Sequence, residues 1–287
     1  MRFKNMNLKF YLVIAVLFLI KYSYGFNPDD FPKYFYNIED TLQIKFELLA
    51  QENNDIQKEA LCSEISILFK KVLENNNSFD FRFRSLKYVG IIYSPDLKFR
   101  IIQWNLPYND GTHKYFGFIQ YHKSKRKTVL IELHDKSDLI TKPQLEKLSS
   151  KNWYGALYYK IIHNTYKENE YYTLLGSDLN NMFTKKKIIE ILTFDRKGNP
   201  SFGAMVFKNQ NKPAARIIFE YSIQANMVLT YDQNKEMIIF DHLSPSRPSL
   251  VGRYEFYGPD FSYDGMKFER GIWNYYPDLD IRNYNIE

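Results

Sequence analysis

The sequence predicts an α+β protein dominated by strands, in which an N-terminal pair of amphipathic helices precedes a large antiparallel β-meander. Apolar residues recur at intervals of three and four over residues 41–74, and from residue 79 onward they alternate in twos. Turn-forming residues then recur about every 8 to 12 positions, which is typical of closely spaced strands. Such a chain can form a curved sheet, a barrel or a propeller-like stack.

Residues 1–25 have the pattern of a secretory signal peptide. Three basic residues precede the apolar run 10–20 and two small residues follow it, namely Arg2, Lys4 and Lys9 before the run and Ser23 and Gly25 after it. The run is about half the ~20 residues needed to span a bilayer, and no other stretch is apolar enough. We therefore expect cleavage, no transmembrane segment afterwards, and a soluble protein in the periplasm or associated with the outer envelope.

Charge and cysteine content exclude two classes of protein. The net charge is +6, but four basic residues and no acid belong to residues 1–25, so the mature part carries only +2. This is too weak to indicate a nucleic-acid partner. The single cysteine, Cys62, cannot form an internal disulfide, and its helical apolar surroundings predict a small buried side chain. An intermolecular disulfide or a catalytic thiol are the alternatives.

The N-terminal helical segment is expected over residues 26–78. Its two helices are separated by a polar turn at residues 51–55, where Asp55 is a plausible N-cap for the second helix. Residues 75–77 are expected to end that helix. Because each helix has one apolar face, both should pack on the sheet that follows and form one unit with it.

The antiparallel β domain is expected over residues 79–287. It begins with the alternation of Phe79, Phe81 and Phe83. A first meander is predicted at residues 88–93, 99–106, 115–121 and 128–133. A second series is predicted at residues 154–162, 171–175, 188–194, 202–207, 215–221, 227–231 and 237–240, with one short helix at residues 144–150 between the two series. No signature repeats with a fixed period.

A possible calcium site begins at Asp260. Asp260, Ser262 and Asp264 place oxygen donors at alternate positions, and Gly265 follows them, as in the first half of a calcium loop. The bidentate glutamate expected at the twelfth position is replaced by Gly271. A plain turn between two strands, with Asp264 and Gly265 at its tip, is therefore the preferred interpretation. The cofactor prediction is none, or possibly calcium.

No residue can be assigned a catalytic role. His134 with Asp135, and Asp241 with His242, stand at the ends of strand runs, where the fold could bring them together. No nucleophile elbow and no phosphate-binding loop is present. Three aromatic groups could present rings to a sugar or a peptide, and they begin at Trp153, Tyr254 and Trp273.

Five segments of the second half, 171–176, 187–194, 219–222, 238–245 and 257–265, resemble a family of uncharacterised exported envelope proteins of Gram-negative bacteria. The likeness covers roughly residue 78 to the end. Ser177 and Leu179 stand where the resemblance implies a tryptophan and a glycine. It implies a periplasmic or outer-envelope setting and no particular activity.

Two functions are consistent with these observations. The first is a non-enzymatic binding or assembly module whose aromatic surface takes an envelope protein or a glycan. The alternative is a hydrolase of an envelope polymer that uses Asp241, His242 and residues 260–264. The oligomeric state is left open.

Overall fold

The computed structural model describes residues 31–124, 127–209 and 212–280. The predicted signal peptide lies outside them. Two helices, α2 (Lys33–Gln51) and α3 (Asp55–Leu73), are followed by strands that form three sheets. None of the described helices is long and apolar enough to cross a membrane.

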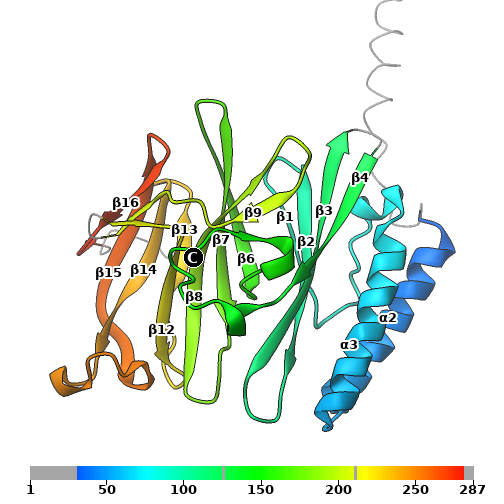
Figure 1. Cartoon of the computed structure of the whole chain (residues 1–287), viewed down its shortest axis with the longest axis horizontal. Coiled ribbons are helices and arrows are strands. Elements are labelled where there is room, and N and C mark those ends of the chain that lie inside the picture. The colour runs from blue at the N-terminus through cyan, green and yellow to red at the C-terminus, as the bar shows by residue number, and fades with distance from the viewer. Residues whose placement is uncertain (1–30, 125–126, 210–211, 281–287) are drawn as a thin grey trace, which may run out of the picture.

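The sheets are stacked in one row, with the helices at one end of the row (Figure 1). The first, here called the helix-side sheet, has the order β1-β2-β3-β4 and contains β1 (Gly90–Tyr93), β2 (Phe99–Pro107), β3 (His113–Ser124) and β4 (Lys127–His134). The order of its strands follows the chain, so the predicted first meander is confirmed.

The central sheet and the outer sheet contain the remaining strands. The central sheet has the order β5-β9-β8-β7-β6, and β12 is also paired to β8. Its strands are β5 (Leu148–Ser149), β6 (Leu157–Tyr166), β7 (Asn169–Asp178), β8 (Thr184–Phe194), β9 (Pro200–Phe202) and β12 (Arg216–Ser222).

The outer sheet has the order β11-β10-β16-β15-β14-β13. Its strands are β10 (Phe207–Asn209), β11 (Lys212–Ala214), β13 (Leu229–Asp232), β14 (Met237–Pro245), β15 (Tyr257–Glu269) and β16 (Ile272–Tyr276).

No described sheet closes on itself, so the barrel alternative is wrong. Each sheet ends in two different edge strands, for example β1 and β4 in the helix-side sheet. The strand pairs between described strands are antiparallel, except for the short parallel pair of β10 and β16. The β-dominated α+β class with two helices before antiparallel sheets is confirmed.

Three hydrophobic cores fill the spaces between the four layers. Consecutive residues of β2 show this, because Ile102 packs toward the helices and Ile101 packs toward the central sheet. In β8, Ile188 faces the helix-side sheet and Ile189 faces the outer sheet. A strand covered on both faces needs no alternation of apolar and polar residues, which explains why consecutive residues of β2 and β8 are buried.

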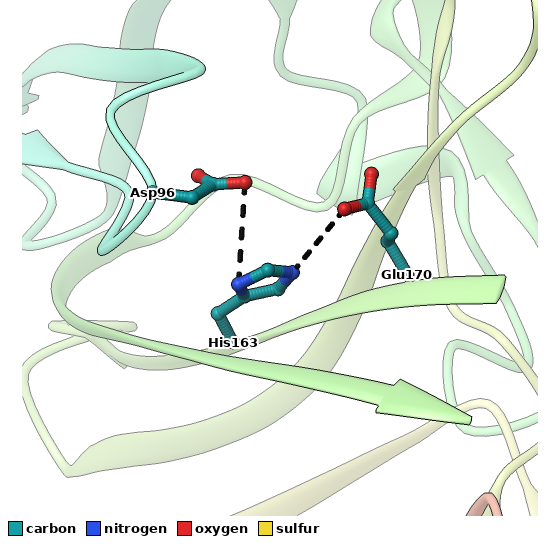
Figure 2. Close-up of side chains that lie close together, drawn as sticks. All are labelled: Asp96, His163 and Glu170. Atoms are coloured by element: carbon teal, nitrogen blue, oxygen red, sulfur yellow. Dashed lines mark ion pairs between the residues drawn. The ribbon is translucent and has the colours of Figure 1, made fainter. Parts of the chain in front are cut away.

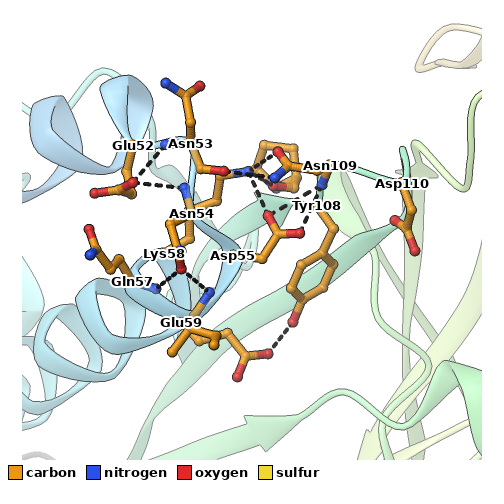
Figure 3. A network of polar contacts seen from close by, with 12 residues as sticks. Glu52, Asn53, Asn54, Asp55, Gln57, Lys58, Glu59, Tyr108, Asn109 and Asp110 are labelled. Carbon is orange, nitrogen blue, oxygen red and sulfur yellow. Dashed lines mark hydrogen bonds and ion pairs between the residues drawn. The ribbon is translucent and has the colours of Figure 1, made fainter.

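The helices are fixed to the helix-side sheet through their connecting turn, which meets the turn between β2 and β3 (Figure 3). Lys58 Nζ donates to Asp55 Oδ1 at 2.8 Å, to the Pro107 carbonyl at 3.1 Å and to Asn109 Oδ1 at 2.9 Å. The N-cap of α3 is Asn54, whose side chain accepts from the backbone N–H groups of residues 56 and 57. The predicted cap, Asp55, is instead the first helical residue and an ion-pair partner of Lys58.

The predicted strand around Phe79, Phe81 and Phe83 is wrong. The three rings are buried, but the segment begins with a 3-10 helix, Asn76–Asp80, and pairs with no described strand. Its carbonyl groups are bound by a side chain instead, because the buried Arg100 donates to the carbonyls of Phe81 and Ser78, both at 2.6 Å. Alternating burial therefore arises here without a strand.

Two smaller predictions are also wrong. Residues 144–150 contain the strand β5 and the start of a 3-10 helix, Ser150–Asn152, rather than an α-helix. The predicted strand 202–207 is divided into β9 in the central sheet and β10 in the outer sheet. The chain thus passes from one layer to the next at this point.

Candidate functional site

The residues predicted for calcium lie within the long strand β15 and not in a loop. Gly265 pairs with Ile239 on one side and with Tyr276 on the other, so Asp264 and Gly265 do not form the tip of a turn. The preferred turn interpretation is therefore wrong. A bulge precedes them: residues 260–262 stand opposite His242 alone, between the pairs formed by Asp241 and Leu243.

The carboxylates of this strand are bound by other protein groups. Asp260 Oδ1 accepts from the backbone N–H of Ser262 at 3.1 Å and from its hydroxyl at 2.7 Å. The buried Asp264 contacts His242 Nδ1 at 2.7 Å and accepts from the Tyr275 hydroxyl at 2.6 Å through the same oxygen. Its other oxygen accepts from a backbone N–H at 3.1 Å. Calcium at these three residues stays a prediction.

His242 and Asp264, two candidate residues of the alternative hydrolase, lie in contact. The hydrogen bond to Asp264 raises the pKa of His242 above its ordinary value, although partial burial acts in the opposite direction. Asp241 lies beside them in sequence, but its Oδ2 accepts from the Val228 backbone N–H at 2.6 Å, and burial raises its pKa. The pair resembles a base with its orienting carboxylate.

The other histidine pair does not join this cluster. His134 ends β4 of the helix-side sheet and Asp135 follows it, whereas Asp241 and His242 belong to the outer sheet. The central sheet lies between these layers (Figure 1). Asp135 instead accepts from the backbone N–H groups of Tyr115 and Gly155 at 2.9 and 3.2 Å. It has a structural role in holding the chain after β4.

Only one of the three predicted aromatic groups lies largely at the surface. Trp153 and Trp273 are fully buried, because they fill the two cores on either side of the central sheet. Tyr254 and Phe256, by contrast, are 44% and 39% exposed. They belong to the short 3-10 helix Tyr254–Phe256 in the connection between β14 and β15.

This connection lies at one end of the molecule, beside the β7–β8 and β12–β13 turns (Figure 1). Two adjacent hollows separate the three segments, and both are lined by Glu255. One, of about 380 Å³, is also lined by Asn181, Phe183, Thr184, Glu220, Gly252 and Tyr254. The other, of about 350 Å³, is also lined by Ser222, Gln224, Ser244, Pro245, Ser246, Phe256, Tyr257, Gly258 and Pro259. We call the two together the rim groove.

The walls of the rim groove are held by hydrogen bonds. The Tyr257 hydroxyl accepts from the Gly252 backbone N–H at 3.0 Å and so closes the loop that carries Tyr254. Glu255 Oε1 accepts from the Arg253 guanidinium at 2.9 and 3.1 Å. Its own backbone N–H and this guanidinium lower the pKa of Glu255, so the groove carries an ionised carboxylate at neutral pH.

Sequence reasoning missed a second histidine cluster, formed by Asp96, His163 and Glu170 (Figure 2). The sequence could have predicted the proximity of His163 and Glu170. A tight hairpin turn at residues 166–169 makes them diagonal neighbours on the same face of the β6–β7 hairpin. Asp96 comes from the turn between β1 and β2 in another sheet. No local pattern predicts that contact.

Comparisons with known proteins add nothing to this geometry. No family model, no curated protein and no solved structure matches the chain.

Proposed function

We propose that this chain is a non-enzymatic glycan-binding module of the bacterial envelope, and that the rim groove is its binding site. The observation that carries the proposal is the lining of the groove. Hydroxyl, amide and carboxylate groups alternate there with the exposed rings of Phe183, Tyr254 and Phe256. Binding sites for small ligands combine apolar surface with a few fixed polar groups in this way.

The chemistry of the lining fits a sugar better than an apolar peptide. Sugar rings present C–H groups on their faces, which can pack on aromatic rings, whose faces carry partial negative charge. Their equatorial hydroxyls need acceptors and donors around the rim. Glu220 and Glu255 supply acceptors, and Gln224 supplies both kinds of group.

The envelope setting supports the choice of a glycan. The predicted signal peptide and the resemblance both indicate export, and the envelope is rich in polysaccharide. The net charge of the mature part is close to neutral, so a long-range electrostatic attraction to a nucleic acid does not compete with this proposal.

The proposal is tested by titrating the mature protein with a panel of soluble envelope oligosaccharides in a calorimeter. We expect one class to bind, and we expect Tyr254→Ala and Phe183→Ala each to weaken binding about tenfold or more. Phe261→Ala is the matched control, because Phe261 is 93% exposed on β15 and does not line the groove. Absence of binding across the panel, or equal losses in all three variants, would contradict the proposal.

A hydrolase of an envelope polymer is the second candidate. The contact of 2.7 Å between His242 Nδ1 and Asp264 favours it, because a carboxylate in this position orients an imidazole that can activate water. Among the described residues, no hydroxyl or thiol side chain hydrogen-bonds to His242 directly. The Tyr275 hydroxyl is linked to it only through Asp264, to which both are bound. Release of new reducing ends that disappears in His242→Gln would favour this candidate over simple binding.

A further inference from the structure

Three side chains of the types that ligate metals converge between the helix-side sheet and the central sheet. Asp96 lies in the turn between β1 and β2, His163 on β6, and Glu170 on β7 across the hairpin. One ligand atom of each lies within 4.8 Å of those of the other two. Figure 2 shows the imidazole of His163 between the two carboxylates.

The spacing between His163 Nε2 and Glu170 is close to that of a metal centre. His163 Nε2 lies 3.6 Å from Glu170 Oε1, and His163 Nδ1 lies 4.0 Å from Asp96 Oδ2. A nitrogen and an oxygen bound at about 2.1 Å to one tetrahedral zinc ion are about 3.4 Å apart. One metal ion binds only one of the two imidazole nitrogens. At Nε2, the distance to Glu170 needs little change, whereas Asp96 now lies nearest to Nδ1 and has to turn toward Nε2.

His163 provides an independent observation that points to a ligand. Its Nε2 atom is buried and has no hydrogen-bond partner among the residues that the structure describes. A buried nitrogen without a partner is costly to the fold, and such groups in native proteins often mark a missing ion or water. Coordination to a metal would satisfy it.

A lysine ammonium now stands between the carboxylates. Lys98 Nζ is 2.5 Å from Glu170 Oε1 and 3.4 Å from Asp96 Oδ2. The Lys98 ammonium thus partly neutralises the two carboxylates of the cluster. Because the Lys98 side chain is 42% exposed, it can turn into solvent without leaving a cavity.

Other groups hold the ligands in place. The Tyr172 hydroxyl donates to Asp96 Oδ2 at 2.7 Å, and the Tyr172 ring stacks on His163 with ring centroids 4.7 Å apart. The Lys98 backbone N–H donates to Asp96 Oδ1 at 3.3 Å. Partners of this kind fix the orientation of metal ligands.

We propose that Asp96, His163 and Glu170 bind a divalent transition-metal ion of the zinc class, and that the metal displaces the Lys98 ammonium. One imidazole and two carboxylates suit zinc better than calcium, which prefers oxygen ligands alone. The metal would join the β1–β2 turn to the β6–β7 hairpin and so link two sheets. This inference is independent of the rim groove, which contains none of these residues.

Zinc titration of the chelator-treated chain tests the proposal, with calorimetry and the melting temperature as readouts. We expect stoichiometric binding and a melting temperature that rises with zinc concentration. His163→Asn and Glu170→Gln should each weaken binding at least about tenfold. Lys98→Met should strengthen binding about tenfold, because it removes the competing charge, and Lys151→Met, at an exposed lysine elsewhere, should change nothing.

The opposite response of Lys98→Met makes the test specific. A surface site elsewhere would bind zinc equally in the wild type, His163→Asn and Lys98→Met, and this result would overturn the proposal. Absence of zinc binding in Lys98→Met would overturn it as well. If His163→Asn fails to fold, the visible absorption spectrum of Co²⁺ added to Lys98→Met tests the site instead. Bands of an ion with a nitrogen ligand would support the proposal, and the spectrum of hexaaqua cobalt would contradict it.

Discussion

The backbone N–H of Ile223 donates to the carbonyl oxygen of Phe183 at 2.9 Å and thereby joins the β12–β13 turn to the β7–β8 turn. Asn181 braces the same turn, since its Oδ1 accepts from the backbone N–H groups of Phe183 and Thr184 at 2.8 and 3.0 Å. The Phe183 ring is 66% exposed although its backbone is held. A backbone held in this way loses little freedom when a ligand binds to the ring.

Asn181→Ala should therefore weaken glycan binding more than it weakens the fold. The substitution removes the two bonds that hold the turn, so the free turn becomes more variable and binding has to order it. We expect the dissociation constant to rise about threefold to tenfold, while stability falls by about 1 kcal/mol. Calorimetric titration and urea denaturation of the same preparation measure the two effects. A large loss of stability with unchanged affinity would be the contrary result.

A buried ion pair in the central sheet should be essential for stability. Arg216 donates to Glu190 Oε2 at 2.7 and 2.9 Å, both side chains are fully buried, and the Tyr158 hydroxyl donates to the other oxygen of Glu190. Glu190→Gln leaves the arginine without a compensating charge, and we expect a loss of about 3 to 5 kcal/mol in the free energy of unfolding.

Tyr158→Phe is the milder comparison for the same cluster, because it leaves the charges in place. It removes the hydrogen bond to Glu190 and the acceptor of the Trp153 indole N–H. We expect it to cost about 1.5 to 3 kcal/mol. Urea denaturation ranks the two variants, and equal losses would show that the charge balance of the pair is not what matters.

The stability of the protein should depend on the protonation of His242. Its folded-state pKa is raised by Asp264, so the protonated form favours the folded state. This contribution is fully present below the unfolded pKa of about 6.5 and is lost as the pH rises through the higher folded value. Because the imidazole is about half exposed, the effect is small.

His113 and His122 provide an internal contrast, because burial lowers their pKa values. In a ¹H–¹⁵N NMR titration of the imidazoles, His242 should titrate above these two. Asp264→Asn should lower the pKa of His242 and leave the other two unchanged. A His242 that titrates at or below 6.5 in the wild type would contradict the assigned contact.

Calcium should have little effect on the melting temperature. Asp264 already accepts bonds from the Tyr275 hydroxyl and the Asp278 backbone N–H, and it also contacts His242. A cation at Asp260, Ser262 and Asp264 would have to displace some of these donors. A rise of several degrees with calcium that is abolished in Asp260→Asn and reversed by a chelator would show that the calcium prediction is right.

Much of the fold could be predicted from local patterns. The runs that became β2 and β8 place apolar residues on both faces, and the turn residues between the first four strands define their order. The conformation of residues 79–83 could not be predicted, because an alternating pattern predicts which side chains are buried but not whether the backbone pairs with another strand. Only the tertiary position of Arg100 shows which donors bind these carbonyl groups.

The sites were less accessible to sequence reasoning. The contact of His242 with Asp264 depends on a bulge that sets residues 260–262 against one residue, and no composition rule predicts that register. Asp96 lies in a turn of the helix-side sheet, whereas His163 lies on the central sheet. The rim groove is formed by three connections that meet only because the central and outer sheets are stacked. In each case the decisive information lies in the packing of layers.

Amide chemical shifts recorded during a titration with the best oligosaccharide show directly where the glycan binds. Binding in the rim groove should shift Asn181, Phe183, Gln224 and Glu255, with little change at His242 and Asp260. Shifts confined to His242 and the bulge of β15, or spread over the helices α2 and α3, would contradict it.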